Sequence, residues 1–156
     1  MIMASQQLPG GGGQVAIPLD AILAQLAELR KYMEALQTQL NQITGELTEV
    51  RTSQKMVAEL KTSRPDELLA PADRRGHILL RASPRDVETV VAHIGLNYYA
   101  EVPLEKATEI LLLKEKELRK VYGDLQRELN QVVSQYQQLE ALVNTVMAQA
   151  KKQEAR

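Results

Sequence analysis

The sequence predicts an α+β protein, mainly α: a long antiparallel two-helix coiled coil with two β-hairpins inserted between the helices. Two long segments carry apolar residues in alternating steps of three and four, and the stretch between them changes to short apolar runs separated by turn residues. Aromatic residues are scarce, with five Tyr, no Phe and no Trp. The apolar content is therefore mostly Leu, Val, Ile and Ala, which suit the narrow seam between long helices.

Residues 1–17 are predicted to form a flexible Gly-rich tail, separate from a single folded unit over residues 18–156. Pro9 is followed by four glycines, and ordering such a segment costs much conformational entropy. A phosphate-binding loop would end in Gly-Lys-Ser or Gly-Lys-Thr, but Gln14 and Val15 follow the glycines here. We therefore predict no nucleotide site in the tail.

The first coiled-coil helix is predicted over residues 18–63. Pro18 stands where helices often begin, and Pro65 disfavours a helical conformation at the residue before it. Only Gln54 interrupts the apolar seam between these two prolines. The seam consists of Leu19, Ile22, Leu26, Leu29, Met33, Leu36, Leu40, Ile43, Leu47, Val50 and Val57.

The second helix is predicted over residues 104–152, after Pro103. Where the polar run Lys114–Glu117 displaces apolar residues, we expect a local slip in the register of the seam. Antiparallel pairing of the helices should bring Leu60 near Leu104 and Leu19 near Met147. The seam of the second helix consists of Leu118, Tyr122, Leu125, Leu129, Val132, Tyr136, Leu139, Val143, Val146 and Ala150.

Residues 64–103 are predicted to form two successive β-hairpins, with strands over 67–72, 77–82, 87–94 and 98–102. Isolated hairpins are marginally stable in water, and open strand edges pair with other chains. The hairpins are therefore the predicted oligomerisation site. The residues expected to contact a partner there are Ile78, Leu80, Val90, Val91 and Ile94.

Near the two ends of the chain, apolar residues also lie beside the seam, as at Leu23 and Met147, and Glu140 is the one charge between Asn130 and Ala150. An apolar, weakly charged surface suits non-specific contact with other apolar surface. We predict that it binds non-native proteins, although these residues could instead pack on one another or on a neighbouring helix. The predicted client-binding residues are Ile17, Leu19, Ile22, Leu23, Leu26, Leu139, Leu142, Val143, Val146 and Met147.

Composition argues against several other functions. The 19 basic and 20 acidic residues nearly cancel, whereas nucleic-acid binders and polybasic membrane-surface proteins are lopsided. There is no Cys, no signal peptide and no apolar run long enough to span a bilayer, so a cytoplasmic protein is expected. His77 and His93 have no companion at metal-ligand spacing. We expect no metal, no cofactor and no enzymatic activity.

Three segments resemble the alpha-type prefoldin family, whose layout is helix, two hairpins, helix. Residues 67–72, with Pro71 after an apolar residue, are similar to the family's entry strand. Residues 90–101 are similar to its Gly-bearing link between strands three and four. Residues 103–107 are similar to the opening of its second helix. The resemblance covers residues 19–150. Gly95-Leu96-Asn97 departs from the Gly-Ala-Gly that the family often has, and Asn97 is expected to supply the left-handed conformation.

The resemblance implies an ATP-independent chaperone that holds non-native proteins. It implies a hexamer of two alpha and four beta subunits, in which the hairpins form a double β-barrel and the coiled-coil tips bind clients and deliver them to a group II chaperonin. Two alternatives remain open. The chain could be an alpha-like paralogue that assembles with itself, or a structural coiled-coil scaffold.

Overall fold

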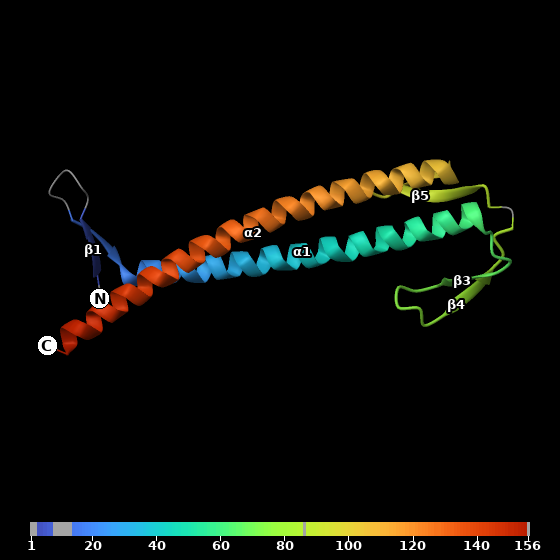
Figure 1. Ribbon diagram of the computed structural model, residues 1–156. Coiled ribbons are helices and arrows are strands. Elements are labelled where there is room, and N and C mark those ends of the chain that lie inside the picture. The colour runs from blue at the N-terminus through green and yellow to red at the C-terminus, as the bar shows by residue number, and fades with distance from the viewer. Residues whose placement is uncertain (1–2, 8–13, 86, 156) are drawn as a thin grey trace. The chain divides into compact units, whose positions relative to one another are not determined.

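The computed structural model describes residues 3–7, 14–85 and 87–155, with side chains from residue 18 onward. Contact clustering divides the chain into two units: Met1–Gln42 with Tyr122–Arg156, called the terminal unit below, and Ile43–Val121, called the hairpin unit. The element order is shown in Figure 1. The elements are β1 (Met3–Gln7), β2 (Gln14–Pro18), α1 (Leu19–Thr62), β3 (Leu68–Pro71), β4 (Leu79–Ala82), β5 (Thr89–Gly95), β6 (Tyr98–Pro103) and α2 (Leu104–Glu154).

The predicted fold class is confirmed, because two long helices enclose two antiparallel hairpins in the sequence. Each helix begins directly after a proline, at Leu19 and at Leu104, since proline at this point loses no hydrogen bond of the helix. Asp20 lies in the first turn of α1 and Lys61 in its last. Both charges interact favourably with the helix dipole and stabilise the helix.

The apolar seam follows the predicted spacing. In α1 every seam position from Leu19 to Val57 is buried or half-buried, while the residues between them are exposed. In α2 the predicted seam residues are also buried or half-buried, except for the exposed Tyr122. Leu60 and Leu104 belong to one buried cluster, which confirms antiparallel pairing in the hairpin unit. The predicted pairing of Leu19 with Met147 remains a prediction.

The core of the hairpin unit is a small cluster where α1 ends and α2 begins. It consists of Val57, Leu60, Leu104 and Ala107. Both hairpins reach this cluster, because Leu68 of β3 and the paired residues Val90 and Val102 of β5 and β6 pack against it. Val87 and Leu111 complete its partly buried surroundings. One side of each hairpin is thereby attached to the helices.

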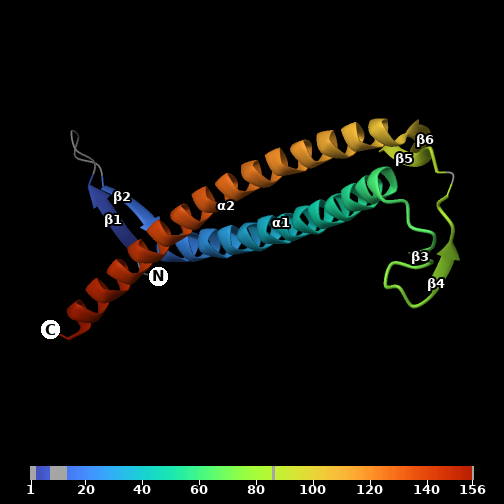
Figure 2. The ribbon, with the colours of Figure 1, turned by 45° about the vertical axis from the view of Figure 1, so that its right-hand side comes forward.

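The hairpins form two separate two-stranded sheets, as Figure 2 shows. Leu68 of β3 pairs with Ala82 of β4, and the register continues to Pro71 opposite Leu79. In the second hairpin the register shifts between His93 and Gly95, so the ladder contains a bulge at this end. Neither sheet is large enough to bury a face by itself.

Residues 1–17 differ from the predicted tail in their described parts. Met3–Gln7 and Gln14–Pro18 form an antiparallel pair in which Ala4 lies opposite Ile17. Val15 and Ile17 are β-branched and favour strands, and our expectation gave this preference less weight than the neighbouring glycines. The glycines themselves lie outside the described residues.

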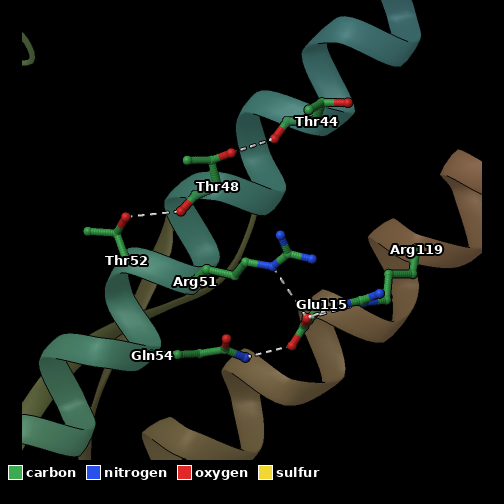
Figure 3. Close-up of polar contacts among 7 residues, drawn as sticks. All are labelled: Thr44, Thr48, Arg51, Thr52, Gln54, Glu115 and Arg119. Atoms are coloured by element: carbon green, nitrogen blue, oxygen red, sulfur yellow. Dashed lines mark hydrogen bonds and ion pairs between the residues drawn. The ribbon is translucent and has the colours of Figure 1, made fainter.

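The slip of register expected near Lys114 remains a prediction. The seam of α2 runs on from Leu111 through Glu115 to Leu118 in steps of four and three, with a carboxylate at one seam position. Figure 3 shows that Gln54, the one polar seam residue of α1, donates a hydrogen bond from Nε2 to Oε2 of Glu115 at 2.9 Å. The polar interruptions of the two seams therefore face one another.

Candidate functional site

Only part of the predicted client-binding set is accessible in the terminal unit. Leu23 and Met147 are 46% and 49% exposed. Ile22 and Val143 are buried in the seam, so they support the coiled coil. Ile17 belongs to β2, but its side chain lies outside the described residues. The remaining members are half-buried: Leu19, Leu26, Leu139, Leu142 and Val146.

Between Asn130 and Ala150 the surface of α2 carries mostly amides and small side chains, and Glu140 is its one charge. A shallow hollow of about 430 Å³ lies along it, lined by Asn144, Thr145, Ala148, Gln149 and Lys152. Amide groups can donate and accept hydrogen bonds with any peptide backbone. An exposed Met beside such groups is adaptable, because its side chain is unbranched and polarizable. This surface is chemically suited to binding many different sequences.

Polar contacts hold the two helices together within the terminal unit. Arg30 Nη2 donates a hydrogen bond to the hydroxyl of Tyr136 at 2.7 Å, and the Arg30 guanidinium lies 5.8 Å from the centre of that ring. Tyr32 donates to the carboxylate of Glu128, which raises the pKa of Tyr32. These bonds join side chains at the edge of the seam, so the helices are tied together without covering Leu23 or Met147.

The predicted oligomerisation residues are mostly exposed in the hairpin unit. Ile78 and Val91 are 63% and 69% exposed, and Leu80 and Ile94 are also exposed. Val90 differs from the other four, because it faces the helices and packs on the buried cluster of its own chain. Successive residues of a strand point to opposite faces, so Val90 and Val91 cannot both face a partner.

The sequence prediction missed other exposed apolar residues of the hairpins. They lie on the same two hairpins and include two tyrosines. Strand alternation from Val90 could have identified part of this set, because residues on the face opposite Val90 are left uncovered by the helices. These additional residues are Leu69, Leu79, Leu96, Tyr98 and Tyr99.

The turn of the first hairpin is polar and closed by hydrogen bonds. The Asp73 carboxylate accepts from the backbone N–H groups of Arg75 at 2.9 Å, His77 at 3.3 Å and Ile78 at 3.2 Å. Partial burial alone would raise the pKa of Asp73, but the bonds from His77 and the backbone lower it below the usual value. Gly76 supplies the left-handed backbone with φ of 72°. This turn is satisfied by its own residues.

Glu115 is the centre of the polar cluster in Figure 3. Besides the bond from Gln54, its carboxylate accepts from Arg119 Nη2 at 2.8 Å, and Arg51 Nε lies 3.8 Å away. The hydrogen bonds from Gln54 and Arg119 lower the pKa of Glu115. A polar pair in an apolar seam favours one pairing register over others, at some cost in stability. The cluster therefore specifies how the helices pair and is not arranged for catalysis.

Nothing in the described parts of the chain resembles a metal centre, since no three histidine or carboxylate side chains gather there. In the same residues, neither helix contains a stretch that is long and apolar enough to cross a membrane. What the geometry does present is two kinds of exposed apolar surface, one on the hairpins and one on the terminal unit. The fold and these surfaces define a class of protein: a coiled-coil subunit that acts by binding other chains.

Comparison with known proteins identifies the family within this class. The model of the family described as prefoldin subunit matches residues 29–149. The chain is 33% identical to prefoldin subunit alpha of Metallosphaera sedula over 136 residues, which cover 87% of this chain and 94% of that subunit. It is 30% identical to prefoldin subunit alpha of Sulfurisphaera tokodaii over 141 residues, covering 90% and 92%. The same subunit of Saccharolobus solfataricus is 30% identical over 138 residues.

The chain belongs to the prefoldin family. This membership implies the role of a chaperone subunit, and the similarity to alpha subunits implies assembly with beta subunits. The resemblance stated from the sequence is thereby confirmed.

Proposed function

We propose that this chain is the alpha-type subunit of a cytoplasmic holding chaperone, a hexamer of two alpha and four beta subunits. The terminal unit binds non-native proteins, and the complex delivers them to a group II chaperonin without using nucleotide. Binding comes from many weak apolar contacts, so release occurs by competition. This proposal extends the chaperone-subunit role of the family to particular surfaces of this chain.

One observation carries the client-binding part: Leu23 and Met147 are about half exposed, and Met147 lies in the stretch from Asn130 to Ala150, which has Glu140 as its one charge. Contiguous apolar patches rimmed by polar residues mark interaction sites on soluble proteins. Transfer of the exposed half of both side chains from water to a client would contribute roughly 2 kcal/mol, or about a factor of 30 in affinity.

The test compares aggregation suppression by assembled complexes that carry different variants. The double variant Leu23→Ser with Met147→Ser should need about tenfold more complex for half-suppression of a denatured client. The matched control is Leu112→Ser, which changes a 55% exposed leucine of the hairpin unit and should behave as the wild type. Sedimentation must show that all complexes have the same mass. Equal loss of holding in the control would place the client site elsewhere.

A second experiment removes residues 1–30 together with 140–156. The truncated chain should still assemble with beta subunits, because the hairpins and their buried cluster are intact. It should no longer suppress aggregation. Loss of assembly on truncation would mean that these residues are structural, and the client-binding proposal would then be wrong.

Self-assembly is a second candidate, favoured by the open edges of the two-stranded sheets. Those edges could meet copies of this chain as well as beta subunits. The mass of the chain in solution, alone and mixed with a beta-type prefoldin subunit, separates the two. A discrete hetero-oligomer that forms only on mixing supports the alpha-subunit proposal, whereas a large homo-oligomer indifferent to the beta subunit supports the self-assembling paralogue.

A further inference from the structure

The tip of the second hairpin combines two unfavourable features at neighbouring positions. Leu96 has a left-handed backbone with φ of 49°, and it is the one non-glycine residue with positive φ among those described. The expectation that Asn97 would supply this conformation is wrong. Directly before it, the register shift between His93 and Gly95 leaves Ile94 as the extra residue of a bulge. A left-handed leucine is strained, because its Cβ crowds the following carbonyl.

The described residues leave the side chain of Leu96 almost uncovered. The Leu96 side chain is 86% exposed, the largest fraction among the large apolar side chains that the structure describes. A two-residue connection between strands favours Gly, Asn or Asp where φ is positive. Each hairpin of this chain also has a glycine with positive φ, Gly76 in the first and Gly95 in the second. A leucine at the left-handed position of the second turn is therefore not explained by the residue preferences of the turn itself.

The strained conformation is held in place by its neighbours. His93 Nε2 lies 2.6 Å from the carbonyl oxygen of Leu96 and donates to it, and the His93 ring lies 5.1 Å from that of Tyr99. A bulge re-aims the side chains around it. Ile94 and Tyr98 are exposed beside Leu96, and no acidic or basic residue occurs from Ile94 to Tyr99. The result is a fixed, uncharged, apolar projection.

We propose that Leu96 is an anchor residue of the subunit interface, which inserts into an apolar pocket on the sheet of a neighbouring beta-type prefoldin subunit. The inference rests on the proposed assembly with beta subunits and names the residue that fixes it. Backbone strain of this kind persists where a binding site requires it. The exposed face of the same hairpin, which includes Val91, continues from the anchor, so one partner can cover both. An uncharged tip requires an uncharged pocket, since buried unpaired charge is costly.

The proposal predicts effects of opposite sign in two assays on Leu96→Gly. Glycine relieves the strain, so the urea midpoint of the chain alone should stay the same or rise. The same change removes the anchor, so the dissociation constant for a purified beta-type subunit, measured by titration calorimetry, should increase by at least about tenfold. Leu96→Asn, which also tolerates the left-handed conformation, should behave like Leu96→Gly. Leu96→Met keeps an apolar side chain and should bind within about threefold of the wild type.

The outcomes separate this inference from the proposed function. If the wild-type chain does not bind the beta-type subunit, the assembly itself is refuted before any variant is compared. If the wild type binds and Leu96→Gly binds equally well, the anchor is refuted while the assembly stands. An effect of Leu96→Gly on self-association of the chain alone, with binding of the beta subunit unchanged, would assign the pocket to a second copy and overturn the stated partner. An effect confined to client holding would overturn it as well.

Discussion

The buried cluster of the hairpin unit makes Leu60→Ala the most informative stability variant. Leu60 is 5% exposed and shares the cluster with Val57, Leu104 and Ala107. Removal of three buried carbon groups at about 0.8 kcal/mol each lowers the free energy of unfolding by about 2.4 kcal/mol. The cavity adds to this, so we expect a loss of about 3 kcal/mol.

The assay is urea unfolding of the chain alone, followed by far-UV circular dichroism at a concentration where sedimentation shows one species. In a thermal scan the same loss should lower Tm by roughly 6–12 °C for a chain of this length. The matched control is Leu23→Ala, because it makes the same chemical change at a side chain that is 46% exposed. Less apolar area is lost there, so we expect about 1 kcal/mol or less.

The cluster differs from an ordinary seam position because both hairpins pack on it. Leu68 and Val90 of the two hairpins pack on the cluster, so Leu60→Ala should also increase hydrogen exchange at the backbone amides of β3 and β5. The reasoning would be refuted if Leu60→Ala and Leu23→Ala had equal effects on stability. Unchanged exchange in the hairpins would refute their attachment to the helices through this cluster.

Four further predictions concern single positions. Gly76→Ala should destabilise the chain by about 1 kcal/mol, because φ is 72° there. Gly45→Ala should stabilise it by about 0.5–1 kcal/mol, because Gly45 lies inside α1, where glycine is unfavourable and a Cβ meets nothing within 4 Å. Thermal unfolding measures both changes. The lowered pKa of Glu115 means that its stabilising contribution is present above the unfolded value of 4.5 and is lost as pH falls through the folded pKa. Glu115→Gln should therefore make Tm fall less steeply below pH 4.5, and an unchanged slope would contradict this. Arg74→Ala should change stability by less than about 0.5 kcal/mol, because its ion pair with Glu49 is exposed to solvent.

The sequence predicts the elements well because their signals are local. The three-and-four spacing of apolar residues places the seam of α1 without error, and prolines mark where both helices begin. The seam of α2 was harder to predict near Lys114, because a polar residue can occupy a seam position when a partner meets it. That partner, Gln54, lies 61 residues away in the sequence, and a linear pattern does not reveal such a pairing.

The surfaces are predicted less completely, because exposure depends on which face of a strand meets the helices. Val90 and Val91 are the same residue type, yet Val90 packs on the buried cluster and Val91 is 69% exposed. Residue preference also assigned the left-handed turn position to Asn97, where the structure uses Leu96. A preference describes a residue in an average context, so it does not anticipate a position where the fold imposes strain.

The two small sheets have a consequence for how much of this chain a cell can make. Each strand of β3–β4 and β5–β6 has a neighbour on one side only, so the other side of every strand offers unpaired backbone groups. Chains synthesised in excess of their partner keep these groups open, and open edges lead to aggregation or to capture by proteases. The steady-state amount of the chain should therefore follow the supply of its partner, and balanced synthesis of the two becomes a requirement that the fold itself imposes.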